Sequence, residues 1–508
     1  MSKFSMYLKE LLDQRGEPIA RIAKNAGLER TSIHKALKDE RILPYTSLNQ
    51  LTRYLQLTLS QTRELNQYYE MLLQGEEIFL IQEDICDLLS GLSQLSFYSE
   101  ADNQAPEQTP IAERFFHGVC DLSPSVREVA LPLDTAISVQ PGLVYGKMQV
   151  EKMIHLLLRK ETVSENAEFY LSIPSGETMV QEALFHLWSD GRVFSVHQMV
   201  AFLPQHFGKE TTIFNLKILR AVIPMALISQ GRYHPYYYFE SNADSVSVDP
   251  FPYYIITPEY VLRLDEKMST AQLLSDENIV ELYRTHYVQL MRECQPLTSY
   301  SNDLAEVLEA YMMSTDETGY YTIMTQPCLG HYYTRKLMEL QFREDIPDRD
   351  KMIELSDRRF DRLRRLDRNY YTVFTEQGIR QFAENGVAAD LPPDLVKPGS
   401  PQLRLELLGQ LRKDIASGVI TGCITDASRL DIPDYLTLTA DPQFGLHIYA
   451  IIGFPAGPYT CNLHIQESSI GQSFCSFIKS LPGSKFVYPQ EKTLSILDEL
   501  IAQLEMET

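Results

Sequence analysis

The sequence predicts an all-α domain of five helices at the N-terminus, followed by a larger α/β body in two lobes. Three observations support this. The 508 residues exceed one ordinary core, because a domain holds roughly 150 residues. Apolar residues in the first seventy-five positions recur at the i, i+3, i+4 spacing of amphipathic helices. From about residue 112, short strand-like runs alternate with helical runs, as in α/β layers.

The N-terminal helices can be placed from this spacing. Phe4 to Leu12 carry the first stripe, and Gly16 ends it. Pro18 begins a second, short helix, and Gly27 provides the turn after it. A third helix starts near Glu29. Leu48, Leu51 and Leu55 mark the fourth helix. The fifth helix has a possible capping box of Thr58 with Gln61 at its start, and its apolar residues are Leu65, Tyr68, Tyr69 and Leu72.

Two short helices joined by a glycine turn form a helix-turn-helix. The run Ala23-x-x-x-Gly27-Leu28-x-x-x-x-Ile33 resembles the lambda-repressor-like, Cro-type (XRE) family over about residues 4–73. The resemblance implies that Ala23 lies at a close helix crossing, Gly27 in the turn, and Leu28 and Ile33 in the core. Position 19 departs from the family, because many members carry a polar glutamine there and this chain has isoleucine. The family binds double-stranded operator DNA, and a two-fold homodimer on a palindromic site is implied.

The third helix carries the residue types that contact DNA. Arg, Ser, Thr and Lys side chains read base edges and bind phosphates. By family position, the residues expected to face bases are Arg30, Thr31, Ser32 and Lys35. Those expected to contact phosphates are Lys38, Arg41 and Arg21. His34 could serve either role.

Charge separates the two parts of the chain. The net charge is -22, but residues 1–45 hold nine Lys/Arg against six Asp/Glu, which is 9 - 6 = +3. The rest therefore carries -25, so a protein whose whole surface binds nucleic acid or an anionic membrane is excluded. The seven cysteines lack C-x-x-C spacing, the first residues lack an apolar signal core, and no apolar run reaches roughly 18 residues. We expect a cytoplasmic, bacterial protein without a membrane segment.

The predicted domains are residues 1–75, a connector over 76–111, and two α/β lobes over 112–298 and 299–508. Helical spacing from Ile81 to Leu92 indicates either a dimerisation helix or the first helix of the body, and the polar stretch Ser99–Pro110 indicates a linker. In the lobes, Thr211–Leu216 and Lys485–Tyr488 are among the predicted strands. The order of elements is loosely similar to that of the inactive phospholipase D-like sensor lobes of some bacterial regulators.

The body lacks the catalytic motifs sought in it. No histidine is followed two residues later by lysine, and H-E-x-x-H, Walker, G-x-G-x-x-G and G-x-S-x-G patterns are absent from the sequence. We therefore expect a protein that is not an enzyme and has no cofactor and no metal.

Three features of the body suggest ligand binding, each with an ordinary structural alternative. The turn at Ser175, Gly176 and Thr178 suits an anion or is a simple helix cap. Tyr236 and Tyr238, in an aromatic cluster, line a pocket or pack a half-buried strand. Asp357–Arg368, with six Arg and three Asp, binds an anion, a partner or flanking DNA, or pairs with itself.

These observations predict a sequence-specific transcription regulator, such as a repressor, whose large body dimerises it and senses a small-molecule or peptide effector. A ligand would shift the body between two dimer geometries and thereby set the half-site spacing. An alternative is a DNA-binding repressor or antitoxin controlled by a protein or peptide partner. A third hypothesis, an enzyme recruited to DNA, has little support from the motifs.

Overall fold

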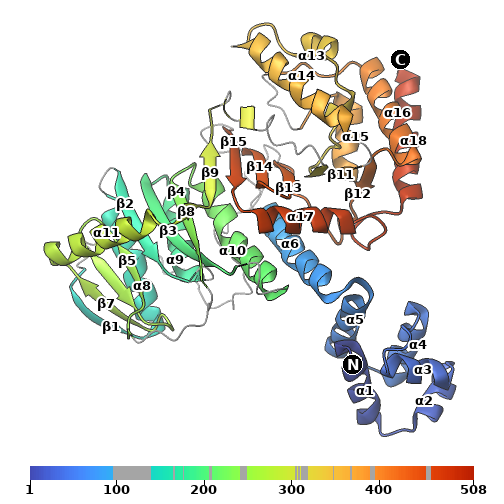
Figure 1. Ribbon diagram of the computed structural model, residues 1–508, viewed down its shortest axis with the longest axis horizontal. Coiled ribbons are helices and arrows are strands. Elements are labelled where there is room, and N and C mark those ends of the chain that lie inside the picture. Colours follow the sequence, from blue (N-terminus) through green and yellow to red (C-terminus); the bar gives the residue numbers. More distant parts are fainter. Residues whose placement is uncertain are drawn as a thin grey trace, which may run out of the picture. The chain divides into compact units, whose positions relative to one another are not determined.

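A computed structural model gives the arrangement of the chain (Figure 1). It describes residues 1–94, 139–163, 166–174, 177–204, 209–240, 249–303, 306, 309–310, 319–346, 348–366, 369–389, 395–452 and 459–507. The chain divides into two compact units, Met1–Glu83 and Asp84–Thr508.

The first unit is helical and has its own core. Phe4, Leu8, Ile22, Ile33 and Leu48 are each at most 1% exposed and pack together in it. Its helices are α1 (Lys3–Arg15), α2 (Ile19–Ala26), α3 (Arg30–Leu37), α4 (Tyr45–Leu55), α5 (Leu59–Gln74) and the first part of α6 (Glu76–Gln94).

The sequence predicts five helices at the N-terminus, and the structure has six within the first 94 residues. The sixth is the connector helix, which follows α5 almost without interruption because only Gly75, at φ 90°, separates them. A glycine tolerates this backbone conformation at no steric cost, so one helix ends and the next begins within a single residue.

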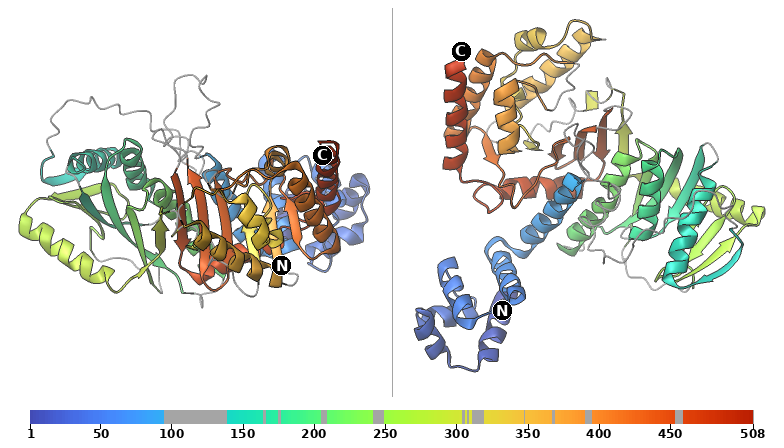
Figure 2. Two further views of the ribbon diagram at one scale, coloured as in Figure 1. Left: turned by 90° about the horizontal axis from the view of Figure 1, so that it is seen from above. Right: turned by 180° about the vertical axis from the view of Figure 1, so that it is seen from behind.

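The second unit is a mixed α/β structure with two sheets, as Figure 2 shows from two further directions. In the eight-stranded sheet the order is β1-β7-β6-β5-β2-β3-β4-β8, with β2, β3 and β4 parallel and the other pairs antiparallel. Its elements are β1 (Gly142–Tyr145), α8 (Lys147–Glu161), β2 (Ala167–Ser172), α9 (Thr178–Ser189), β3 (Phe194–Phe202), α10 (Lys209–Ile228), β4 (Tyr233–Phe239), β5 (Tyr253–Ile256), β6 (Val261–Leu264), β7 (Thr270–Leu274), α11 (Glu277–Met291) and β8 (Gln295–Pro296).

The seven-stranded sheet has the order β12-β11-β10-β13-β14-β15-β9, and only β10, β11 and β12 run parallel. Helix α17 packs against its central strands. Its elements are β9 (Thr298–Ser301), β10 (Tyr320–Ile323), the 3-10 turn η3 (Gly330–Tyr332), α13 (Arg335–Gln341), α14 (Arg349–Arg365), β11 (Tyr370–Phe374), α15 (Glu376–Asn385), α16 (Pro401–Ser417), β12 (Thr421–Ile424), β13 (Leu436–Asp441), β14 (Gly445–Ile452), β15 (Tyr459–Ile465), α17 (Ser468–Ser480) and α18 (Gln490–Glu507).

Two predicted strands are wrong. Thr211–Leu216 belongs to α10, because the β-branched residues at its start lead into a helical stripe at Leu216, Leu219 and Ile223 that is buried. Lys485–Tyr488 forms only one isolated bridge, between Val487 and Thr425. The linker predicted at Ser99–Pro110 lies outside the described residues. Among the described helices, none combines the length and the apolar character that a membrane crossing requires.

Candidate nucleic-acid interface

The turn between α2 and α3 has the geometry that its sequence predicts. Gly27 lies in the left-handed region at φ 70°, which favours glycine. The Leu28 amide donates to the Ala23 carbonyl at 2.8 Å and closes the end of α2. Because this turn is fixed by backbone hydrogen bonds, α3 leaves α2 in a defined direction. Figure 1 shows the two helices in succession at the N-terminal end of the chain.

Helix α3 has a buried side and an exposed side. Ile33 and Ala36, at 0% and 2% exposure, anchor it in the core of the first unit. Arg30, Thr31 and Lys35 are exposed on the other side. The helix therefore presents two cations and a hydroxyl to solvent, which matches the residue types that read base edges.

The remaining expected contact residues lie around this surface. Ser32 and His34 are half-buried on α3, and Lys38 and Arg41 are exposed in the segment that follows it. Arg21 is exposed on α2. The structure thus places all eight expected residues on α2, α3 and the loop after α3.

The cations of this surface are weakly neutralised. Arg21 Nε is 3.6 Å from Glu17, and Lys38 Nζ is 4.0 Å from Glu40, with both basic side chains about 70% exposed (72% and 69%). Arg30 donates to His34 at 3.2 Å rather than to a carboxylate. Within the described part of the chain, Lys35 and Arg41 have no ion-pair partner. Such side chains remain available for phosphates and base edges.

A carboxylate that the sequence analysis does not single out fixes the end of α3. Asp39 accepts hydrogen bonds from the Ser2 amide and the Ser2 hydroxyl, both at 2.6 Å, and from the Ser5 hydroxyl at 3.1 Å. Burial alone would raise the pKa of Asp39, but the hydrogen bonds from Ser2 and Ser5 outweigh it and hold the pKa below its ordinary value. This clamp joins the start of α1 to the end of α3.

A second polar link joins α2 to α4. The Tyr54 hydroxyl donates to Glu17 at 3.0 Å and accepts from the Asn25 side chain at 2.9 Å. Because Asn25 lies near the end of α2, the link ties that end of the helix to α4. For Asp39, the one signal in the sequence is the residue type, because aspartate tolerates the left-handed backbone conformation that it adopts here, at φ 58°. Nothing local in the sequence indicates the Tyr54 link.

The turn proposed to bind an anion is only partly described. Ser175 and Gly176 lie outside the described residues, and Thr178 is the first residue of α9. The Glu177 carboxylate caps this helix by accepting from the Met179 amide at 3.2 Å. An anion approaching the N-terminus of α9 would therefore meet a carboxylate first.

Tyr236 and Tyr238 lie on the same face of β4 and two residues apart. Tyr236 is half-buried and its ring lies 6.3 Å from that of His197, whereas Tyr238 is 41% exposed. Burial raises the pKa of both phenols. These two residues are part of an aromatic sheet face, and their proposed role in binding a ligand stays a prediction.

The arginine cluster on α14 is largely paired with carboxylates of its own helix. Arg364 lies 3.8 Å from Asp357 and 3.6 Å from Asp361, while Arg365 also contacts Asp361 and Arg358 contacts Glu354. Its positions 367 and 368 lie outside the described residues. Intrahelical pairs of this kind lower the charge that α14 presents to a ligand.

Comparisons with known proteins include two partial likenesses to solved structures. No family model matches the chain, and no curated protein matches it. One similar solved structure is TrmBL2, described as an archaeal chromatin protein with a novel mode of DNA binding; it is 14% identical, with a TM-score of 0.21, over 33% of this chain and 58% of that one. Another is polyphosphate kinase from Porphyromonas gingivalis, 10% identical with a TM-score of 0.21, over 72% of this chain and 56% of that one.

This chain thus spans less than two thirds of either protein, and a TM-score of 0.21 assigns neither a shared fold nor a function. The likeness to a kinase nevertheless contradicts the expectation that the chain is not an enzyme, and that expectation is withdrawn. The likeness establishes no activity in its place.

Proposed function

We propose that this protein is a sequence-specific DNA-binding transcription regulator that contacts DNA through α3. The observation that carries the proposal is the α2–Gly27–α3 helix-turn-helix, with α3 anchored by Ile33 and its exposed Arg30 and Lys35 unpaired with carboxylates among the described residues. In a helix-turn-helix, the second helix enters the major groove.

The side chains divide by role. Arg30 and Lys35 suit the guanine O6 and N7 acceptors. The hydroxyls of Thr31 and Ser32 suit donors or acceptors on the base edges. His34 accepts the Arg30 guanidinium at 3.2 Å, so it orients Arg30 or contacts DNA itself. Arg21, Lys38 and Arg41 flank the helix and suit phosphates, which position the protein without reading sequence.

The second unit would dimerise the protein and sense an effector. One copy of the first unit (the head, Met1–Glu83) covers one half-site. A two-fold homodimer on a palindromic operator would therefore place two α3 helices about 34–36 Å apart or a multiple of that. An effector that favours one dimer geometry would change this spacing and therefore the affinity for DNA.

The proposal is tested by using the full chain to select DNA duplexes from a pool of random sequence. We expect an enriched palindromic sequence that binds roughly 10³-fold or more tightly than a shuffled duplex at the same salt concentration. Enrichment of no sequence, or equal affinity for the enriched and shuffled duplexes, would contradict sequence-specific binding. A comparison with residues 1–83 alone tests the dimer, because the isolated head should bind the palindrome far more weakly.

A further inference from the structure

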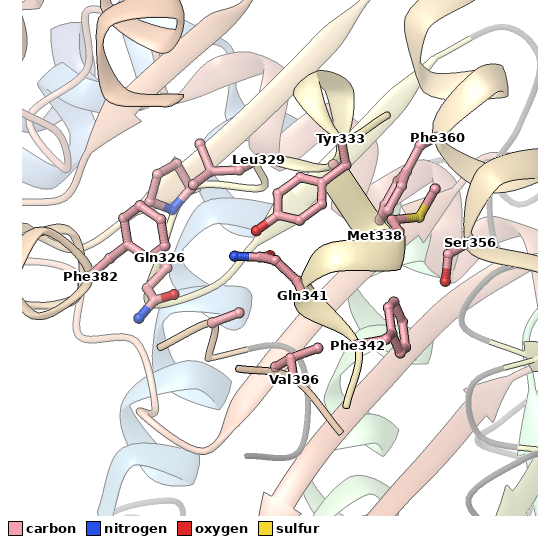
Figure 3. A pocket seen from close by; sticks show the side chains of 13 residues that line it. Gln326, Leu329, Tyr333, Met338, Gln341, Phe342, Ser356, Phe360, Phe382 and Val396 are labelled. Carbon is pink, nitrogen blue, oxygen red and sulfur yellow. The ribbon is translucent and has the colours of Figure 1, made fainter. Parts of the chain in front are cut away.

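A cavity lies in the seven-stranded part of the second unit, and about 40 Å³ of it is open to the centre of a water-sized molecule (Figure 3). The hollow around it, with its open mouth included, measures about 610 Å³. Its walls come from the segment after β10 and from α13, α14 and α15.

The position of the cavity is typical of ligand sites in open α/β sheets. Gln326 and Pro327, which line it, lie three and four residues after the end of β10. At β10 the strand order reverses, because β11 and β12 follow on one side of it and β13 lies on the other. Ligands of such sheets bind outside the carboxyl ends of the strands, at points where the topology changes.

Much of the wall is held in place before any ligand arrives. The Gln326 amide donates to the Val387 carbonyl at 3.0 Å and accepts from the Ala389 amide at 2.9 Å. The Phe360 ring packs directly on Gly330, where an added Cβ would come within 2.5 Å of it. The Phe360 ring also lies 5.6 Å from that of Tyr333. A preformed wall reduces the ordering cost of binding.

One buried polar atom at the cavity has no partner. The Ser356 side chain, 1% exposed on α14, has a buried hydroxyl without a hydrogen-bond partner among the described residues. Such a group costs free energy unless a water or a ligand satisfies it. Figure 3 shows Ser356 at one end of the cavity, with Tyr333 and Gln341 extending toward one another across it.

The lining determines the class of ligand. All the described side chains of the wall are uncharged, and they include the aromatic rings of Phe342, Phe360 and Phe382. A charged ligand would lose its hydration here without gaining an opposite charge. The few polar groups, Ser356, Gln341 and Tyr333, suit a hydrogen-bonding head.

We infer that this cavity binds a small neutral molecule that has an apolar, ring-sized body and an uncharged hydrogen-bonding head. The head lies beside Ser356, and the body lies between the aromatic side chains of the wall. The inference names the ligand class for the effector-sensing role proposed above and rests on that role. It assigns the site to α13 and α14 rather than to Tyr236, Tyr238 or the turn before α9.

Three isosteric probes test it: benzamide, benzoate and benzamidinium, which are neutral, anionic and cationic. Each is titrated into the full chain and followed by saturation-transfer NMR of the probe. We expect saturable binding of benzamide and at least tenfold weaker binding of both ions. Absence of saturable benzamide binding, or equal binding of all three, would overturn the inference.

Ser356→Ala removes the unpartnered hydroxyl and should weaken benzamide binding threefold to tenfold, while thermal unfolding stays unchanged or shifts upward. Ser473→Ala is the matched control, because Ser473 is also a buried helix serine but its hydroxyl donates to the Ser469 carbonyl at 2.7 Å. Unchanged affinity in Ser356→Ala, or equal loss in Ser473→Ala, would also overturn the site. DNA binding without the probe is measured separately, so failure of this site and failure of the DNA interface are distinguishable.

Discussion

Helices α3 and α14 both expose several cations, yet they differ in what those cations contact. On α3, Arg30 donates to a histidine and Lys35 has no ion pair among the described residues. On α14, Arg364 and Arg365 contact Asp357 and Asp361 at helical spacing. The number of basic residues therefore does not determine how much unpaired positive charge a helix presents, because the carboxylates beside those residues also matter.

The physical reason is that a paired cation must give up its partner before it binds a phosphate. The intrahelical pairs of α14 are exposed and contribute little stability, on the order of 0.3–0.5 kcal/mol each. Their effect is on charge, because each carboxylate also repels an approaching phosphate. Helix α3 contains no acidic residue between Arg30 and Leu37, so it avoids this repulsion within its own length.

Removal of the two exposed cations of α3 should have the greatest effect on DNA binding. The double variant Arg30→Ala, Lys35→Ala should lower specific affinity for the selected operator by roughly 2–6 kcal/mol, because each of the two side chains is proposed to read a base and such a contact is worth about 1–3 kcal/mol. Fluorescence anisotropy with a labelled operator measures this. Because both side chains are exposed, the thermal unfolding curve should not change.

The matched control is Arg364→Ala, Arg365→Ala on α14. It removes the same number of cations from an exposed helix, but these cations are paired with carboxylates. Operator affinity should stay within about twofold of that of the unaltered protein. Normal operator binding by the α3 variant would disprove the assignment of α3 as the recognition helix.

A smaller effect concerns the clamp that fixes the end of α3. Asp39→Asn removes a charged acceptor of three hydrogen bonds from Ser2 and Ser5. We expect a loss of roughly 1.5–3 kcal/mol of unfolding free energy, the range for a hydrogen bond to a charged group. Chemical denaturation measures it, and Asp13→Asn, at an exposed position of α1, should change stability by less than about 0.5 kcal/mol.

The pH dependence of this clamp has a definite sign. The pKa of folded Asp39 is held below its ordinary value of 3.8, so the unfolded chain binds the proton more tightly. Its contribution to stability is therefore complete above pH 3.8 and is lost as the pH falls through the lower, folded pKa. If acid weakened the Asp39→Asn variant as much as the unaltered protein below pH 4, the acid sensitivity would come from other carboxyl groups.

The sequence predicts the helical unit better than the α/β unit. Helices α1, α2, α4 and α5 each repeat apolar residues at one spacing and end at a glycine or begin after a proline or threonine, so local rules suffice. Strands β3 and β10 are not predicted, because Phe194–Phe202 carries histidine and glutamine near its centre and Tyr320–Ile323 is only four residues long. Their strand identity depends on neighbouring strands distant in sequence.

The two candidate sites differ in the same way. The α3 residues follow one another in sequence, so a motif could indicate them. The cavity side chains, by contrast, come from separate segments, for example Gln326, Gln341, Ser356 and Phe382. Only the fold brings them together, and no spacing in the sequence records that they meet. The Asp39 clamp escapes prediction for the same reason, since Ser2 and Asp39 are 37 residues apart.

The salt dependence of DNA affinity is a further, smaller test of the difference between α3 and α14. Arg21, Lys38 and Arg41 of each head, doubled in a dimer, would neutralise about six phosphates. The slope of log affinity against log salt should then be about -5, from roughly -0.9 per phosphate. Charge reversal at two paired positions of α14, Arg364→Glu and Arg365→Glu, should leave that slope unchanged, because those guanidinium groups are paired with Asp357 and Asp361. A steeper slope in the unaltered protein that flattens on charge reversal would instead mean that α14 contacts flanking DNA. A slope near zero would contradict DNA binding by this protein altogether.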